Sequence, residues 1–171
     1  MSVSLEQGVL DAVNAELVNG FQNIHRLVVK KLTEAGEEAV KKARLIVTSG
    51  GGGGSILPPY EVQTGNLVSS TGYAVVAEGQ IVKMSSFEAV SGKTDKNGKL
   101  LGDGTEGSAT GRAFVKELAM RFPEGYALIL VAGMHYASYV QELYHRDVLV
   151  SGSLVAEQLV MELQEKINNS R

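Results

Sequence analysis

The stretch that decides the fold is residues 5–32, LEQGVLDAVNAELVNGFQNIHRLVVKKL. Its apolar residues recur in steps of four and three, which places them on one stripe of an α-helix. These residues are Leu5, Val9, Val13, Leu17, Phe21, Ile24, Val28 and Leu32. Ser4 precedes the stripe as an N-cap, and Gly20 weakens the helix by roughly 1 kcal/mol relative to alanine.

A helix of this length reaches beyond a compact domain of 171 residues, since some 30 residues extend about 45 Å. Gly36 is a candidate break or kink, after which residues 37–47 can continue the helix. A projecting helix usually needs a partner to bury its apolar stripe. We therefore predict a long helical arm over residues 1–47, with an interface made by Leu17, Phe21, Ile24 and Val28.

Two loops rich in glycine interrupt the rest of the chain. Residues 48–63 contain five consecutive glycines and then Pro58 and Pro59, so this loop is flexible at one end and stiffer at the other. Residues 91–108 are polar and contain five glycines, which predicts a mobile loop.

The remaining segments alternate between strand and helix patterns. Strands are predicted at residues 73–77, 80–90 and 126–133, the third of them central because it is strongly apolar. Residues 136–143 continue as a strand or as a turn into another one. Helices are predicted at residues 110–122 and 151–167. The order predicts a single α+β domain over residues 1–171. It has a long N-terminal helix and a mainly antiparallel sheet with two further helices packed on one face, and residues 64–171 form the core.

Composition excludes several classes of site. The chain has no cysteine, which removes disulfides, thiolate metal sites and cysteine nucleophiles. A net charge of −3 argues against general nucleic-acid binding. The longest apolar run, residues 126–132, is too short to cross a bilayer, and the N-terminus lacks the pattern of a secretory signal.

Three stretches resemble ligand-binding motifs, but the residues around or within them do not fit those motifs. Ser91-Gly92-Lys93-Thr94 ends like a phosphate-binding loop, but Phe87 stands where the first glycine belongs, and a turn sequence follows instead of a helix. Residues 102–107 match G-x-G-x-x-G without the apolar strand that a dinucleotide site needs before it. Residues 93–104 lack the first acid and the closing glutamate of a calcium loop.

His135, Glu142 and His145 lie close enough in sequence to raise the question of a metal or acid–base site. In an extended segment His135 and Glu142 fall on opposite faces, which favours surface residues instead. His25 is expected to pack or hydrogen-bond within the long helix. No cofactor, metal or catalytic residue is predicted, and the chain is expected not to be an enzyme.

Two short motifs carry a resemblance. Thr64, Gly65, Asn66 and Leu67, followed by Ser70, resemble the T-G-x-L-x-x-S signature of the tailed-phage head–tail joining family, which comprises neck and tail-completion proteins. In that family the motif follows a long helix and a loop and precedes a β-hairpin. Thr64 would cap a short helical turn, Gly65 would permit a tight backbone turn and Leu67 would anchor in the core.

The second motif is Tyr136-Ala137-Ser138-Tyr139-Val140-Gln141, which is similar to the family's Y-A-x-Y-V-E at the end of a β segment. Tyr136, Ala137, Tyr139 and Val140 match it. Gln141 replaces the acidic residue, and Leu143 stands where the family often has a glycine. Residues 149–167 resemble the family's C-terminal helix.

The resemblance implies a virion structural protein, assembled in the host bacterial cytoplasm, that forms a ring of six or twelve copies at the head–tail interface, with six favoured. It could act as connector, neck or tail-completion protein. Its partners would be itself and phage proteins on the connector or portal side and on the tail-tube side, with no membrane. DNA would pass without sequence-specific binding. Two alternatives remain open: a metal-dependent hydrolase using His135, Glu142 and His145, and a helical adaptor or binding module.

Overall fold

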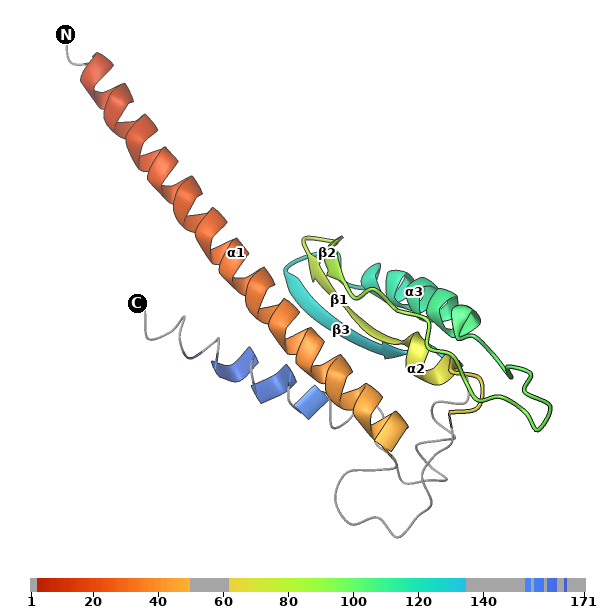
Figure 1. Cartoon of the computed structure of the whole chain (residues 1–171). Coiled ribbons are helices and arrows are strands. Elements are labelled where there is room, and N and C mark those ends of the chain that lie inside the picture. The colour runs from red at the N-terminus through yellow and green to blue at the C-terminus, as the bar shows by residue number, and fades with distance from the viewer. Residues whose placement is uncertain are drawn as a thin grey trace.

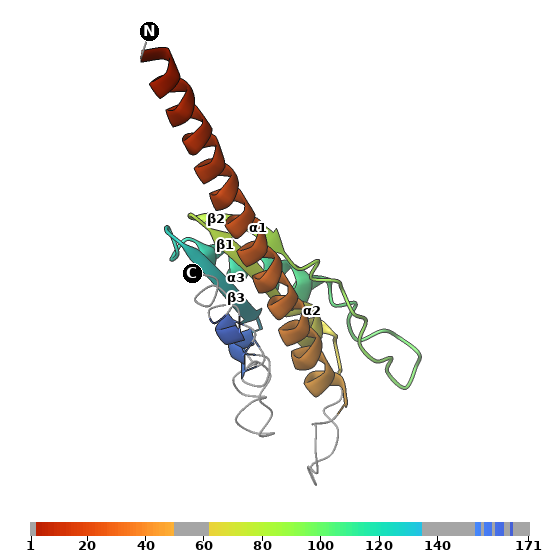
Figure 2. The same cartoon turned by 90° about the vertical axis from the view of Figure 1, so that its left-hand side faces the viewer.

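Helix α1 dominates the shape of the molecule (Figure 1). The computed structural model describes residues 3–49 and 62–134 and, in the C-terminal part, residues 153, 154, 156–158, 160–162 and 165. Helix α1, Val3–Ser49, runs for 47 residues without interruption, which corresponds to roughly 70 Å. Its second half lies along the body of the protein, and its first half projects beyond it (Figures 1 and 2).

Gly36 does not break α1, so the sequence prediction of a break or kink there was wrong. The glycine instead makes room for the ring of Tyr73, because a Cβ atom at residue 36 would lie 2.5 Å from a carbon of that ring. The close approach of helix and sheet explains why a helix-weakening residue is found in the middle of a helix.

Within the described residues, the sheet has three antiparallel strands in the order β2-β1-β3. They are β1 (Thr71–Ala77), β2 (Gln80–Met84) and β3 (Tyr126–Ala132). Every residue of β1 is buried, and β1, rather than the apolar segment 126–133, is the middle strand of the three. A turn at Glu78 and Gly79, both with positive φ, joins β1 to β2.

Strand β2 ends at Met84, six residues earlier than predicted. Ser85 still exchanges backbone and side-chain hydrogen bonds with Tyr73, at 3.0 Å each. Phe87 then adopts a φ of 47° and turns its ring into the core, where it is completely buried. That inward turn ends the strand.

The sheet divides the molecule into three layers (Figure 2). Because side chains alternate along a strand, Tyr73 and Val75 of β1 face α1, whereas Ala74 and Val76 face helix α3, Thr105–Ala119. The core on the α3 side contains Ala74, Val76, Phe87, Val115, Ala119, Ile129 and Val131. The core on the α1 side contains Leu32, Val40, Tyr73 and Val75.

The described C-terminal residues between 153 and 165 are helical and lie on the α1 side. Ala156 is buried against Ala35 and Ala39 of α1, and Val160 packs against the cluster around Leu32. The predicted α+β class with a long N-terminal helix and an antiparallel sheet is confirmed. The two further helices, however, lie on opposite faces of the sheet, because β1 is apolar on both faces and each face needs a cover.

Helix α3 begins at Thr105, five residues before the predicted start. The Asp103 carboxylate accepts hydrogen bonds from the backbone N–H of Thr105 at 3.0 Å and from its hydroxyl at 2.6 Å. These bonds fix the chain at the start of the helix and lower the pKa of Asp103. The last four residues of the predicted loop 91–108 are therefore part of helix α3.

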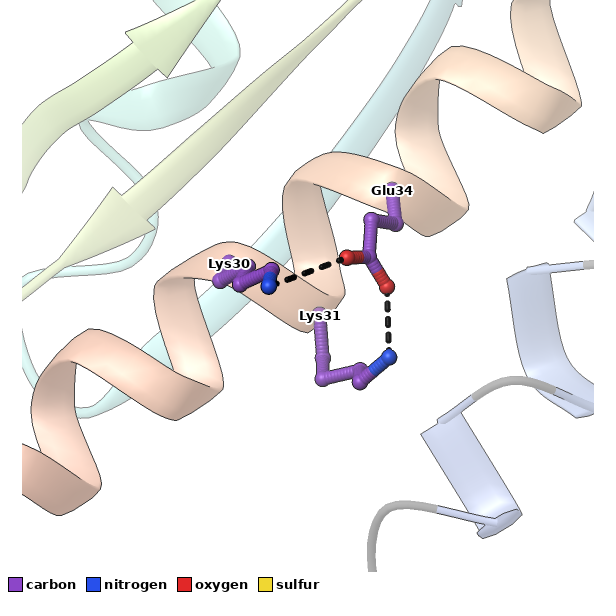
Figure 3. A network of polar contacts seen from close by, with 3 residues as sticks. All are labelled: Lys30, Lys31 and Glu34. Carbon is purple, nitrogen blue, oxygen red and sulfur yellow. Dashed lines mark hydrogen bonds and ion pairs between the residues drawn. The ribbon is translucent and has the colours of Figure 1, made fainter.

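The polar side of α1 carries a small ionic cluster near the point where the helix meets the body (Figure 3). Glu34 lies 2.6 Å from the Lys31 ammonium and 4.0 Å from that of Lys30. Lys30 is exposed, and Lys31 and Glu34 are half-buried but still reach solvent, so the pairs add only a few tenths of a kcal/mol each, about the value of helical pairs at such spacings.

Candidate functional site

The segment with the first motif is a tightly packed corner of the body. Gly65 has a φ of 76°, and a Cβ there would lie 1.7 Å from the carbonyl oxygen of Val90. Helix α2, Asn66–Ser70, follows directly, and Leu67 is buried in the core. The predicted roles of Gly65 and Leu67 are confirmed. Thr64 contributes less than predicted: its hydroxyl accepts a long 3.4 Å bond from the Asn66 N–H, and Gly65 occupies the N-cap position.

Buried hydroxyls stabilise this corner from within. Ser69 donates to the carbonyl of Gly65 at 2.8 Å and accepts from the N–H of Val90 at 2.8 Å. Ser70 and Thr71 both donate to the carbonyl of Leu67 at 2.9 Å. The Ser69 hydroxyl gives the Val90 N–H its partner, and the other bonds give the buried hydroxyls acceptors within α2 and its N-cap. The motif serines are therefore structural, and none is arranged as a nucleophile.

The G-x-G-x-x-G stretch lies at the start of helix α3. Atoms of the protein itself occupy the positions next to its glycines, where a bound dinucleotide would have to approach. A Cβ at Gly104 would lie 2.3 Å from the Ser69 hydroxyl, and one at Gly107 would lie 2.1 Å from the carbonyl of Asn66. Asn66 also reaches the start of α3 through a 2.8 Å bond from its amide to Glu106. The glycines let α2 and α3 touch at backbone distance, so a dinucleotide has no place there.

The phosphate-loop-like and calcium-loop-like stretches form a hairpin between residues 91 and 104. Lys93 donates its N–H to Gln63, and Leu101 donates to Lys93, both at 2.9 Å. The Asp95 carboxylate accepts the N–H groups of Asn97 and Lys99 at 2.8 Å, so it closes the turn. No helix follows Thr94, which pairs with Leu100 instead. The turn that the sequence predicts after Thr94 is confirmed.

A side-chain hydrogen bond also joins α1 to the sheet. His25 shares a 2.8 Å hydrogen bond with the Tyr126 hydroxyl, 101 residues away, so the histidine joins α1 to β3. Within the described residues, no three histidine or acidic side chains gather as metal ligands. His135, Glu142 and His145 and the second motif, Tyr136, Ala137, Tyr139 and Val140, lie outside the described residues.

A groove of about 700 Å³ runs between α1 and the edge of the sheet at β2. Tyr73 lies in it with its hydroxyl 3.3 Å from Glu37, and burial together with that carboxylate raises the pKa of Tyr73 to about 12. Arg44 donates to the carbonyl of Thr71 at 3.0 Å, and burial lowers its pKa. These contacts fasten α1 to β1, so they explain architecture rather than chemistry.

The largest feature that packing leaves unexplained is the first half of α1. We call residues 8–27 the apolar arm. Large apolar side chains in the arm are between 44% and 70% exposed. They are Val9, Leu10, Val13, Leu17, Val18, Phe21, Ile24 and Leu27. A monomeric protein rarely exposes so large a continuous apolar surface to water, so the arm is the candidate interaction site.

Three of the four predicted interface residues belong to this surface. Leu17, Phe21 and Ile24 are exposed, and Phe21 is the most exposed of the arm's large apolar side chains, at 70%. Val28 is half-buried and packs against the Leu32 cluster, so it belongs to the body. The sequence reasoning missed the role of Gly20, which was seen only as a weak point of the helix.

Gly20 forms the floor of a shallow hollow of about 370 Å³ on the arm. The walls come from the same helix and include Leu17, Phe21 and Ile24. A Cβ at Gly20 would have nothing within 4 Å, so the glycine is not needed for packing inside the described molecule. A glycine inside an apolar stripe was the signal in the sequence that could have revealed the hollow.

Comparison of this chain with protein families, with curated proteins and with solved structures finds no match. Over the described residues, no helix combines the length and apolar character needed to span a membrane. The candidate site is therefore defined by the geometry of the arm and by the motif corner alone.

Proposed function

We propose that this chain is a structural protein of a tailed-phage virion, which forms a ring at the head–tail interface as a connector, neck or tail-completion protein. The observation that carries the proposal is the exposed apolar arm of α1. A surface of this kind gains stability only when a partner covers it. Because the arm projects beyond the body, it can reach a neighbouring subunit (Figure 1).

The motif corner supports the choice of protein class. Gly65 and Leu67 have the structural roles that the T-G-x-L-x-x-S resemblance implies, and the segment lies between the long helix and a β-hairpin in the implied order. The described residues that most resemble known catalytic motifs are occupied by packing and turn-forming bonds. The proposal is therefore one of assembly and not of catalysis.

In the proposed ring, neighbours contact one another through α1 and through the sheet edge at β2, whose residues are mostly exposed. Six copies are favoured over twelve, and DNA passes through the lumen without being read. The net charge of −3 agrees with a lumen that does not hold the phosphate backbone. Proteins of the portal or connector side and of the tail-tube side are the neighbours along the axis.

Native mass spectrometry of the purified chain, with negative-stain imaging of the same sample, tests the proposal. Closed rings of six or twelve copies are expected, either alone or on tail-less phage heads. A monomer that joins neither heads nor tails would contradict the proposal.

An adaptor that docks a partner helix on the arm is the second candidate, and the hollow over Gly20 favours it because its shape suits a helix side chain. Its partner would be a different protein, so the purified chain alone would stay monomeric. Replacement of Leu17 and Phe21 by aspartate would then abolish partner binding and leave the body folded, because both side chains are exposed.

A further inference from the structure

The hollow over Gly20 has the geometry of a socket for a side chain of another helix. Leu17, Gly20, Phe21 and Ile24 stand at positions i, i+3, i+4 and i+7 of α1. Four residues at this spacing form the hole that receives one projecting side chain when two helices pack by knobs into holes. The missing side chain of Gly20 leaves room in the hole, and its lining is mainly apolar.

The arm also carries a side chain that fits such a hole. Phe21 lies at the level of the hollow and is 70% exposed. When two identical arms lie parallel and in register, residue 21 of each faces the hole made by residues 17, 20, 21 and 24 of the other. Two copies of the arm therefore complement each other at this level without any further partner.

The pattern along the arm extends this register in both directions. Leu10, Asn14, Leu17, Phe21 and Ile24 follow one another in steps of four and three, as the a and d positions of a coiled coil do. Asn14 is the one polar residue in that series, at an a position. A single asparagine there specifies the register of a parallel pair, because the two amides can bond across the seam.

We propose that the apolar arms of two neighbouring copies of this chain pack parallel and in register, with Phe21 of each copy seated in the Gly20 hollow of the other. The seam covers Leu10 to Ile24 and ends before Leu32, which the sheet already buries. Several hundred Å² of apolar surface on each copy would be removed from water, near the lower limit for specific interfaces of about 1,200 Å² in total. The inference rests on the proposed self-assembly and names one contact within it. A two-fold pair of arms closes after two copies, so the ring also needs the second contact at the β2 edge.

The first test fills the hollow. Gly20→Leu in the full chain places a side chain where Phe21 of the neighbour would sit, and nothing within 4 Å hinders it in the isolated copy. Gly8→Leu is the matched control: it makes the same change at an equally open site of the same helix. Analytical ultracentrifugation is expected to show association at least tenfold weaker for Gly20→Leu than for Gly8→Leu. Equal association of the two variants would overturn the proposal.

The second test uses the absence of natural cysteines. Asn14→Cys places two thiols across the proposed seam, and Asn19→Cys, on the opposite side of the same helix, is its control. Mild oxidation is expected to cross-link Asn14→Cys efficiently and Asn19→Cys hardly at all. Cross-linking of Leu17→Cys without that of Asn14→Cys would indicate antiparallel arms and would overturn the parallel register.

The two proposals fail separately. If the Gly20→Leu variant still forms rings and Asn14→Cys does not cross-link, the ring proposal stands and the arm-pairing proposal is overturned. If Asn14→Cys cross-links but the pairs neither close into rings nor join phage heads, the arm-pairing proposal stands and the head–tail function is contradicted. A chain that stays monomeric at every concentration and on phage heads contradicts both.

Discussion

Gly65 and Gly98 share the same left-handed backbone, with φ values of 76° and 80°, but their surroundings differ. A Cβ at Gly65 would overlap the carbonyl of Val90, whereas one at Gly98 would meet nothing within 4 Å. We expect Gly98→Ala to lower the free energy of unfolding by about 1 kcal/mol, the cost of the backbone conformation.

Gly65→Ala has the same backbone cost, and its Cβ must also push α2 away from Val90. We therefore expect the free energy of unfolding to fall by about 3 kcal/mol or more. Urea unfolding of both variants measures the difference. If the two substitutions proved equally mild, the corner between α2 and Val90 would be looser than its hydrogen bonds imply.

Tyr73 should make stability depend on pH in the alkaline range. Its pKa rises from 10.0 to about 12 on folding, because the phenol is buried and Glu37 lies beside it. Between these two values the unfolded chain loses this proton and the folded chain keeps it, so stability falls as pH rises from 10 to 12. Below pH 10 the contribution is fully present.

Tyr73→Phe removes that titration, so the difference in unfolding free energy between wild type and variant should shrink across the same pH range. Urea unfolding at pH 9, 10, 11 and 12 measures it. A difference that stays constant over this range would show that the Tyr73 phenol is not retained in protonated form by the fold.

Single residues also show what the sequence could predict. Gly65 and Leu67 were assigned their roles correctly because a glycine before a short helical turn and an apolar residue within it have few alternatives. Phe87 could not be recognised as the centre of a core. It lies in a segment that alternates like a strand, and only the positive φ at residue 87 turns its ring inward.

At the scale of elements, α1 is a single helix whose two halves differ in burial: the first is exposed and the second is packed on the sheet. Its second half packs closely on the sheet: Ala35 and Ala39 cluster with Leu128 and Leu130 of β3, and Gly36 lies against the ring of Tyr73 in β1. We expect Gly36→Ala to destabilise the fold by about 1–3 kcal/mol through overpacking, although alanine is the better helix former. Gly8→Ala, in the open arm, should cause no loss. Thermal unfolding compares the two.

If Gly36→Ala raised stability as helix propensity alone predicts, the contact between α1 and Tyr73 would be loose.

Periodicity identified the helix, because apolar spacing is local information. The continuity through Gly36 and the early start of α3 at Thr105 depend on contacts with residues far away in sequence, and so they could not be predicted. The placement of α3 and the C-terminal helical residues on opposite faces has the same cause.

At the scale of the whole molecule, the body and the arm are energetically distinct. The buried clusters on the α1 side begin at Val28 and Leu32, and the described contact of the arm with the sheet is the bond between His25 and Tyr126. The apolar stripe in the sequence predicted both halves as one surface. Only the folded structure separates the part that the sheet covers from the part that it leaves exposed.

Removal of residues 1–24 should therefore leave the body folded, with a free energy of unfolding within about 1 kcal/mol of the full chain, because this deletion keeps His25 and every cluster residue. The same deletion removes Leu10, Asn14, Leu17, Phe21 and Ile24 together with the Gly20 hollow, so the shortened chain should lose self-association through the arm. Urea unfolding and sedimentation velocity on the same sample measure the two effects. If the shortened chain no longer unfolds cooperatively, the arm is part of the folding unit. If it associates as before, the interface lies on the body, and the exposed edge of β2 is the next surface to alter.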